Sequence, residues 1–183
     1  MSLKVSSTTT VLSIIAVTAL TRVLHVVPNM APVTALAVFG AWAFRDVKLA
    51  YIVPILAMIA GDAGLAIVTG DVSYAFHDTQ LVVYACLLGT TWFSLRLKSG
   101  DTYARRALSV LTGSVLFFLA TNLAVWLTSG MYEWSLTGLG QCYTMALPFF
   151  RNSLVSDVVY SALMFGALEL AVRSGVSPIR VKQ

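Results

Sequence analysis

The sequence predicts an all-α integral membrane protein, a bundle of about six transmembrane helices. The prediction depends on composition, on the spacing of the apolar segments and on the distribution of charge. Of the 183 residues, 58% are hydrophobic and 11% are charged, whereas a soluble domain has about 25% charged residues. The mean hydropathy is +0.83. So few charged side chains cannot solvate the protein's surface unless lipid covers most of it, which excludes a cytosolic enzyme, a secreted disulfide scaffold and a disordered tail.

The apolar residues fall into six segments. A membrane-spanning helix needs about 20 mostly apolar residues, and the predicted helices cover residues 9–27, 32–44, 49–69, 79–97, 103–128 and 149–172. The second helix is short for a span, and the third contains Pro54, which removes a backbone hydrogen bond and favours a kink. The chain shows no internal repeat and no linker, so residues 1–183 are predicted to form a single transmembrane domain.

The charges alternate with the six predicted helices. Ten basic residues fall on one side of the bundle: Lys4, Arg45, Lys48, Arg96, Lys98, Arg105, Arg106, Arg173, Arg180 and Lys182. The other side has Arg151 with Asp71, Asp78 and Glu133. Because positive residues concentrate on the cytoplasmic side, both termini are predicted to be cytoplasmic. The net charge of +4 therefore reflects topology, and we expect no binding to nucleic acid.

Three segments allow more than one interpretation. The first resembles a signal peptide in its Lys4 and its apolar run 11–20, although Arg22 and His25 just after that run favour a retained helix. Residues 129–147 are predicted to lie outside the spans, at the membrane interface or folded over the bundle, because they carry almost no charge. The second helix has a small-residue face that either packs inside the bundle or docks a partner membrane protein; it comprises Ala31, Ala35, Ala37, Gly40 and Ala41.

Polar side chains inside the predicted spans mark the candidate site. An ionisable group in the bilayer costs about 2.5–3.5 kcal/mol even on a lenient scale. A helix rises about 1.5 Å per residue, which places four polar residues from four helices in the outer third of the membrane: Arg22, Asp62, Asn122 and Asp157. We expect them to line an outward-facing cavity. In the alternative, Arg22 pairs with Asp62 or Asp157 as a structural lock, and Asn122 makes a single interhelical hydrogen bond.

Catalytic and metal-binding signatures are missing from the sequence. It contains no metalloprotease, hydrolase, P-loop or dinucleotide motif, and its two Cys and two His residues are too scattered for a structural zinc site. His25, one turn above Arg22, is expected at the mouth of the cavity, and Cys86 reaches a similar depth as a small apolar side chain. We therefore expect a protein that is not an enzyme and has no metal or cofactor.

A set of residues spread over nearly the whole chain forms a further pattern. It consists of Pro28, Asn29, Ala35, Leu36, Ala37, Gly40, Asp62, Phe117, Phe118, Asn122, Val125, Trp126, Tyr132, Gly138, Leu139, Cys142, Tyr143, Pro148, Phe149, Phe150, Asp157 and Tyr160. This pattern resembles DUF6580, a family of small bacterial membrane proteins. The overall plan is similar to that of the S-components of energy-coupling-factor (ECF) vitamin transporters, six-helix proteins that bind vitamins near the outer surface.

The resemblance implies uptake of a small, vitamin-like metabolite through the outer pocket, in the bacterial inner membrane. It also implies a transmembrane coupling subunit with ATPases as a partner. A corrinoid is among the candidate ligands, with Cys86 or His25 as a cobalt ligand. S-components often carry an Ala-x-x-x-Ala surface on their first helix. Here the first helix has Ala16 and Ala19, and the four-residue spacing occurs on the second helix instead.

The predicted substrate-binding site combines a cation, two acids and several residues that hydrogen-bond or stack. It comprises Arg22, His25, Asn29, Asp62, Cys86, Asn122, Trp126, Tyr132, Tyr143, Asp157 and Tyr160. Arg22 would attract an anionic group of the ligand, and the two aspartates would accept hydrogen bonds. One alternative is a membrane-embedded enzyme acting on a lipid or isoprenoid, with His25 in contact with Asp62 or a serine. The other is an accessory subunit, in which Arg22 and both acids neutralise one another.

Overall fold

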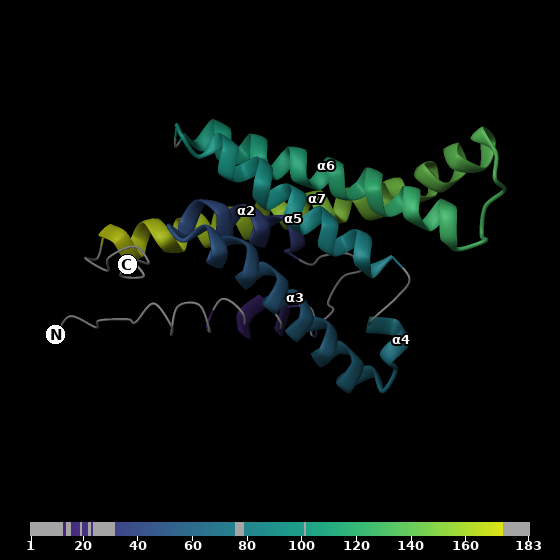
Figure 1. Ribbon diagram of the computed structural model, residues 1–183, viewed down its shortest axis with the longest axis horizontal. Helices are drawn as coiled ribbons and strands as arrows, with labels where there is room; N and C mark the ends of the chain where they lie inside the picture. Colours follow the sequence, from purple (N-terminus) through teal and green to yellow (C-terminus); the bar gives the residue numbers. More distant parts are fainter. Residues whose placement is uncertain are drawn as a thin grey trace.

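A computed structural model describes residues 32–75, 79–100 and 102–173, together with residues 13, 16–18, 20–21 and 23; for residues 74, 75 and 171 it describes the backbone only. Every element in these ranges is an α-helix. The order is α2 (Val33–Ala43), α3 (Val47–Thr69), α4 (Val72–Ala75), α5 (Gln80–Leu97), α6 (Tyr103–Thr128) and α7 (Leu136–Arg173). α5, α6 and α7 run alongside one another, and α3 diverges from them towards α4 (Figure 1).

The short helix α2 lies in the middle of the bundle. It contacts α3, α5, α6 and α7, and its residues from Thr34 to Ala43 are all buried. Its small-residue face therefore packs inside this bundle, where Ala37 and Ala41 are completely enclosed. A Cβ atom on Gly40 would lie 3.1 Å from the carbonyl oxygen of Ala50, so the glycine permits the close approach of α3. Eleven residues span about 16 Å, roughly half of the hydrocarbon core.

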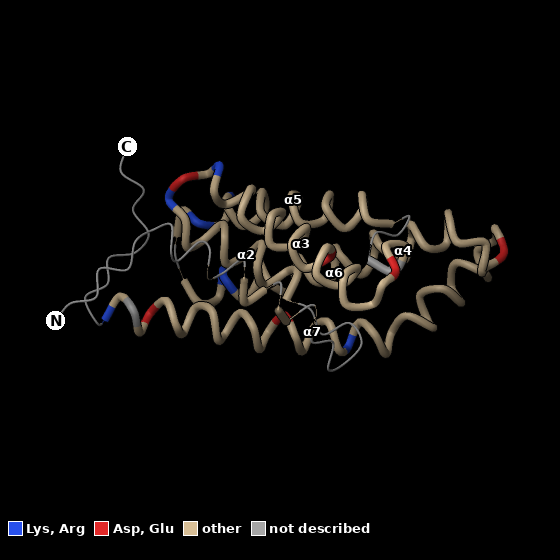
Figure 2. The backbone as a smooth tube through the Cα atoms, turned by 90° about the horizontal axis from the view of Figure 1, so that it is seen from below, with Lys and Arg blue, Asp and Glu red and all other residues tan. Residues whose placement is uncertain are grey.

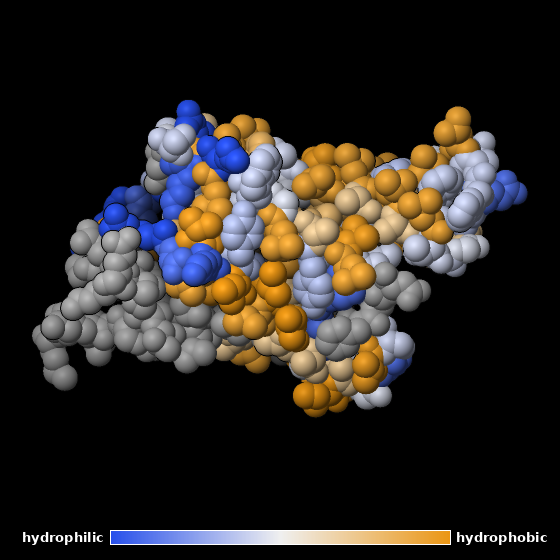
Figure 3. All heavy atoms as spheres, in the orientation of Figure 1, coloured by the Kyte–Doolittle hydropathy of each residue, from blue (hydrophilic) through white to orange (hydrophobic). Residues whose placement is uncertain are grey.

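Four of the described helices are long and apolar enough to cross a membrane: α3, α5, α6 and the part of α7 up to Leu170. Their outer surfaces are apolar, as a lipid environment requires, and Figure 3 shows hydrophobic residues over much of this face of the molecule. On α6 an exposed stripe comprises Leu108, Leu111, Val115, Leu119, Leu123 and Leu127. The described residues thus contain four membrane-length helices where the sequence predicted five, because α2 is too short. Most of the predicted first helix lies outside the described residues.

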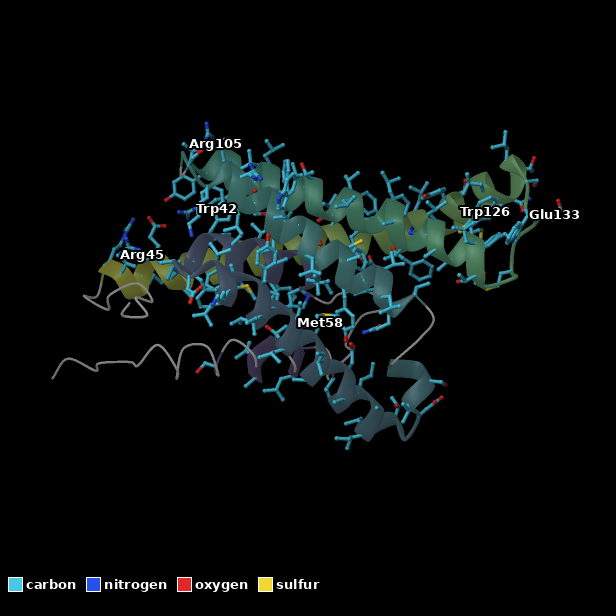
Figure 4. The ribbon with its side chains drawn as sticks, viewed as in Figure 1. Trp42, Arg45, Met58, Arg105, Trp126 and Glu133 are labelled. Atoms are coloured by element: carbon cyan, nitrogen blue, oxygen red, sulfur yellow. The ribbon has the colours of Figure 1, made fainter. Side chains whose placement is uncertain are left out.

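Most of the described basic residues lie at one end of the bundle. Lys and Arg residues gather where α5 connects to α6 and where α7 ends, and a single basic position lies apart on α7 (Figure 2). Trp42, Arg45 and Arg105 lie at that basic end, whereas Trp126 and Glu133 lie at the opposite end (Figure 4). The grouping of basic residues that the sequence predicted is therefore present in the described part of the fold.

The last helix is longer than predicted. The sequence predicted a helix over 149–172 and a segment outside the spans over 129–147, but α7 begins at Leu136 and contains Pro148 in its interior. Its first turns pack on the end of α6, where the Tyr143 hydroxyl donates to the carbonyl oxygen of Leu119 at 2.7 Å. These contacts stabilise a helix that apolar composition alone did not indicate. The 38 residues correspond to about 57 Å, well beyond a hydrocarbon core of about 30 Å.

Gly113 on α6 allows α2, α5 and α6 to meet. A Cβ atom at this position would lie 2.6 Å from Cγ2 of Thr34 and 2.7 Å from Cγ2 of Thr90. We expect Gly113→Ala to lower the apparent melting temperature of the detergent-solubilised protein, because overpacking costs about 1–3 kcal/mol. Gly89→Ala is the matched control, since its Cβ would make an ordinary 3.7 Å contact with Leu116. Equal melting temperatures for the two variants would contradict this account of the packing.

Candidate functional site

Asp157 on α7 caps the amino terminus of α2. Its Oδ1 accepts a hydrogen bond of 3.1 Å from the backbone N–H of Ala35, and its Oδ2 accepts one of 2.7 Å from the Ser114 hydroxyl on α6. The hydroxyl and backbone N–H of Thr34 also bond to this carboxylate. The N-cap residue of α2, Pro32, supplies no side-chain cap. A buried carboxylate from another helix thus satisfies donors that every helix amino terminus leaves unpaired, and it complements the positive end of the helix dipole.

A positive charge caps the other end of α2. The Lys98 ammonium group, which follows α5, donates to the carbonyl oxygens of Ala41 at 2.8 Å and Phe44 at 2.6 Å. A cation at a helix carboxyl terminus complements the negative end of the dipole. The half-span helix is therefore held between an acid and a base that belong to two other helices.

A cavity of about 160 Å³ lies beside Asp157, between α6 and α7. Its polar lining comes from Ser114, Thr121, Asn122, Ser153 and Asp157. Asn122 donates its Nδ2–H to the carbonyl oxygen of Phe118 at 2.8 Å, and Thr121 bonds to its own helix in the same manner. Two residues that the sequence placed at the same depth, Asn122 and Asp157, do line one cavity.

Phenylalanines form the apolar part of this cavity, which is lined by Phe117, Phe118, Phe149 and Phe150. The rings of Phe118 and Phe150 lie with centroids 4.5 Å apart. Two of the four phenylalanines directly follow Pro148, where the missing N–H interrupts the hydrogen-bond ladder of α7. The first turns of α7 run at an angle to the rest of that helix (Figure 1), and a proline inside a helix favours such a bend.

Asp62 belongs to a separate cluster on α3 and α5. It is completely buried, and its Oδ2 accepts hydrogen bonds from Gln80 Nε2 and, at 3.4 Å, from the Tyr84 hydroxyl. Of the two acids, Asp157 lines the cavity between α6 and α7, whereas Asp62 is not among the residues that line it. The sequence gives the depth of a residue along its helix, but it does not say which neighbour that residue faces.

The other predicted site residues lie in several places. Tyr143 touches the cavity indirectly, because its ring packs at 5.6 Å against Phe118. Trp126 lies at the end of α6, where its indole N–H donates to the carbonyl oxygen of Glu133. Cys86 is buried in α5. Tyr132 and Tyr160 are half-buried and are not among the residues that line the cavity, and three predicted positions lie outside the described residues: Arg22, His25 and Asn29.

Several residues at the site were not anticipated. Ser114 and Thr34 support Asp157, Gln80 supports Asp62, and Lys98 caps α2. Serine and threonine within helices commonly bond to the carbonyl four residues earlier. Nothing in the sequence therefore distinguishes Ser114, which also bonds to Asp157, from the other serine and threonine residues of the predicted helices. Lys98 was interpreted only as a marker of topology. Within the described residues, no group of three or more His, Cys, Asp and Glu side chains is placed to hold a metal ion.

These features define a class: a helical membrane protein with a short, doubly capped central helix and a polar, phenylalanine-lined cavity between two membrane-length helices. The chain belongs to a family of unknown function, DUF6580, whose model matches residues 3–178. The family resemblance drawn from the sequence is thus confirmed. No curated protein and no solved structure matches the chain.

Proposed function

We propose that this protein binds a small polar or zwitterionic metabolite in the cavity between α6 and α7 and takes part in its uptake across a cell's inner membrane. The observation that carries the proposal is the cavity lining, which combines one buried acid, four neutral polar side chains and four phenylalanines. Binding sites are mostly apolar with a few placed polar groups, and a buried acid inside a membrane bundle supports a functional role for this cavity.

The cavity favours a ligand with a hydrogen-bond donor or a positive group. Its one ionisable lining residue is Asp157, and phenylalanine faces attract cations. The carboxylate is already bonded to Ala35, Thr34 and Ser114, so it contributes a negative electrostatic potential to the cavity. Asn122 and Ser153 are the polar lining residues that we expect to contact the ligand directly. An amine or a small zwitterion has the matching chemistry.

The volume favours a small ligand. Pockets for drug-sized ligands measure about 300–1,000 Å³, and this cavity holds about 160 Å³. A corrinoid would require the cavity to widen, whereas an amino-acid-sized metabolite or a vitamin precursor requires less change. The half-span helix α2 supports a transport role, because transporters often place binding sites at the ends of discontinuous helices. Its amino terminus meets the cavity wall at Asp157.

The basic end of the bundle supports an orientation. Positive residues concentrate on the cytoplasmic side of membrane proteins. The cavity would then open towards the outer half of the bilayer, and both termini would be cytoplasmic. A coupling subunit with ATPases remains part of this proposal as the source of energy.

The test is a thermal-shift and native mass spectrometry screen of the purified protein against small amines, amino acids, vitamins and vitamin precursors. We expect at least one compound to raise the melting temperature of the wild type and to lose that effect in Thr121→Phe, whose side chain would fill the cavity. Thr128→Phe is the matched control, because Thr128 bonds to its own helix in the same way as Thr121 but lies outside the cavity lining. A hit that shifts both variants equally would place the binding site elsewhere.

A second candidate is a non-transporting accessory subunit of a membrane complex. Its supporting observation is that both buried acids are bonded within the bundle, Asp157 to α2 and α6, and Asp62 to α5. In this case no compound in the screen would produce a shift that Thr121→Phe removes. The protein would instead be recovered with a stable partner when purified from its native membrane.

A further inference from the structure

A second and larger hollow lies at the other half of the α6–α7 contact. This groove, with a volume of about 480 Å³, runs between the first turns of α6 and the last turns of α7. Its lining includes the aliphatic side chains of Ala107, Val110, Leu111, Val158 and Ala162. It shares no lining residue with the smaller cavity, and both of its walls belong to helices long and apolar enough to cross a membrane.

One polar group of the groove lining has no hydrogen-bond partner among the described residues. Ser161 lines the groove and is more than nine-tenths buried, and its hydroxyl makes no hydrogen bond within the described part of the chain. A serine in a helix usually bonds to the carbonyl four residues earlier, and a buried hydroxyl without a hydrogen bond is unfavourable. A ligand that brings an acceptor to this depth would remove that cost.

Charged and aromatic groups gather at one end of the groove. The Arg106 guanidinium lies over the Phe165 ring at 4.8 Å and over the Tyr103 ring at 5.6 Å. The Tyr103 hydroxyl donates to Glu169 at 3.0 Å, and Arg173 lies 3.3 Å from the same carboxylate. This is the basic end of the bundle (Figure 2), where Trp42 and Arg105 also lie (Figure 4).

The order of these groups along the groove matches a glycerophospholipid. Phe165, which lies under the Arg106 guanidinium, is four residues from Ser161, so the hydroxyl is about 6 Å deeper along α7. A phospholipid carries its phosphate at the membrane surface, its ester carbonyls a few bonds deeper and its acyl chains beyond. Arg106 is placed for the phosphate, Ser161 for an ester carbonyl, and the aliphatic walls for a chain. Basic pockets between membrane helices bind anionic headgroups at the cytoplasmic side.

We propose that the groove between α6 and α7 binds one anionic glycerophospholipid from the surrounding bilayer. Gly166, which directly follows Phe165, leaves room for the headgroup, because a Cβ added at this lining position would meet nothing within 4 Å. The bound lipid would hold the basic halves of the two helices together where side-chain packing leaves a gap. Binding of this lipid is independent of the metabolite proposed for the smaller cavity.

The experiment titrates the delipidated, detergent-solubilised protein with phosphatidylglycerol and phosphatidylcholine of identical acyl chains and counts bound lipids by native mass spectrometry. We expect one tight phosphatidylglycerol site in the wild type. Arg106→Gln should weaken its binding about tenfold by removing charge-assisted bonds to the phosphate, and should leave the two lipids nearly equal. Equal affinity of the wild type for both lipids would overturn the proposal.

Filling the groove provides the second arm. Gly166→Leu should abolish the tight site, whereas Gly140→Leu should retain it, because Gly140 is also a helical glycine on α7 with open space around its Cβ but is not in the groove. Phosphatidylglycerol with a photoreactive acyl chain should label the wild type near Val158 and Leu111, the lining residues farthest from the basic end of the groove. Labelling spread evenly over the exposed leucines of α6, unchanged binding in Gly166→Leu, or a dimer cross-linked through this groove would each overturn the proposal.

Discussion

Replacement of Asp157 by alanine is expected to destabilise the protein by about 2–4 kcal/mol. The carboxylate satisfies the amino-terminal donors of α2 through Ala35 and Thr34, and it also accepts from Ser114. Loss of a helix cap costs about 0.5–2 kcal/mol, and each buried donor left without a partner adds about 1–3 kcal/mol.

The measurement is the apparent melting temperature of the detergent-solubilised protein, which should fall by about 4–16 °C. Asp157→Asn should cost less, because the remaining carbonyl oxygen can still accept from the helix terminus. Asp46→Ala is the matched control: Asp46 caps α3 from within its own chain segment, through an exposed bond of 2.8 Å to the N–H of Lys48, and its loss should cost about 1 kcal/mol. An equal fall in melting temperature for Asp157→Ala and Asp46→Ala would show that the buried cap stabilises the protein no more than an exposed one.

Much of the fold could be predicted because apolar segments and charges determine it locally. α6 has the predicted bounds, and α2, α3 and α5 begin and end within two residues of the predicted ones. In each case an apolar run is interrupted by charged or turn-forming residues, such as Asp46 before α3 and Gly70 after it, where φ is +71°. The helical start of α7 was missed, because its first turns depend on bonds to α6 such as that of Tyr143.

The pairing of polar groups could be predicted only in part. The positions of Asn122 and Asp157 along their helices predicted that both residues lie at the same depth in the membrane, and both line the same cavity. The bond between Asp157 and Ala35, which joins residues 122 positions apart, depends on α2 stopping midway through the bundle with its amino terminus turned to α7. That arrangement follows from the packing of four helices around α2. It cannot be predicted from the positions of polar residues within the individual helices.

The two buried acids, Asp157 and Asp62, differ in the groups to which they are bonded. Asp157 meets neutral donors and a helix dipole, which together balance its charge without a cation. The bonds described for Asp62 come from Gln80 and Tyr84, and ionisable residues inside a membrane commonly pair with another charged group. Gln80 Oε1 is also buried without a donor among the described residues. A guanidinium, with five N–H groups, has the donors to satisfy both Asp62 and Gln80.

Arg22 is the candidate for this cation. The next residue, Val23, packs against α3: a Cβ atom on Gly64 would lie 2.8 Å from Cγ2 of Val23, and Gly64 is two residues from Asp62. We therefore expect Asp62→Asn and Arg22→Gln each to cost about 3–5 kcal/mol, because each leaves the other charge buried and unpaired. The double variant should cost little more than either single one, with a coupling energy above about 1 kcal/mol.

The control cycle combines Arg22→Gln with Asp157→Asn. It should be additive within about 0.5 kcal/mol, because the acceptor positions of Asp157 are already filled by α2 and Ser114. The measurement is the free energy of unfolding of all variants under the same denaturing conditions. Additivity in the Asp62 cycle would contradict the lock and would leave Arg22 available for the anionic group of a ligand. Coupling confined to the Asp62 cycle means instead that Arg22 joins the predicted first helix to α3, and that ligand recognition depends on the neutral side chains between α6 and α7.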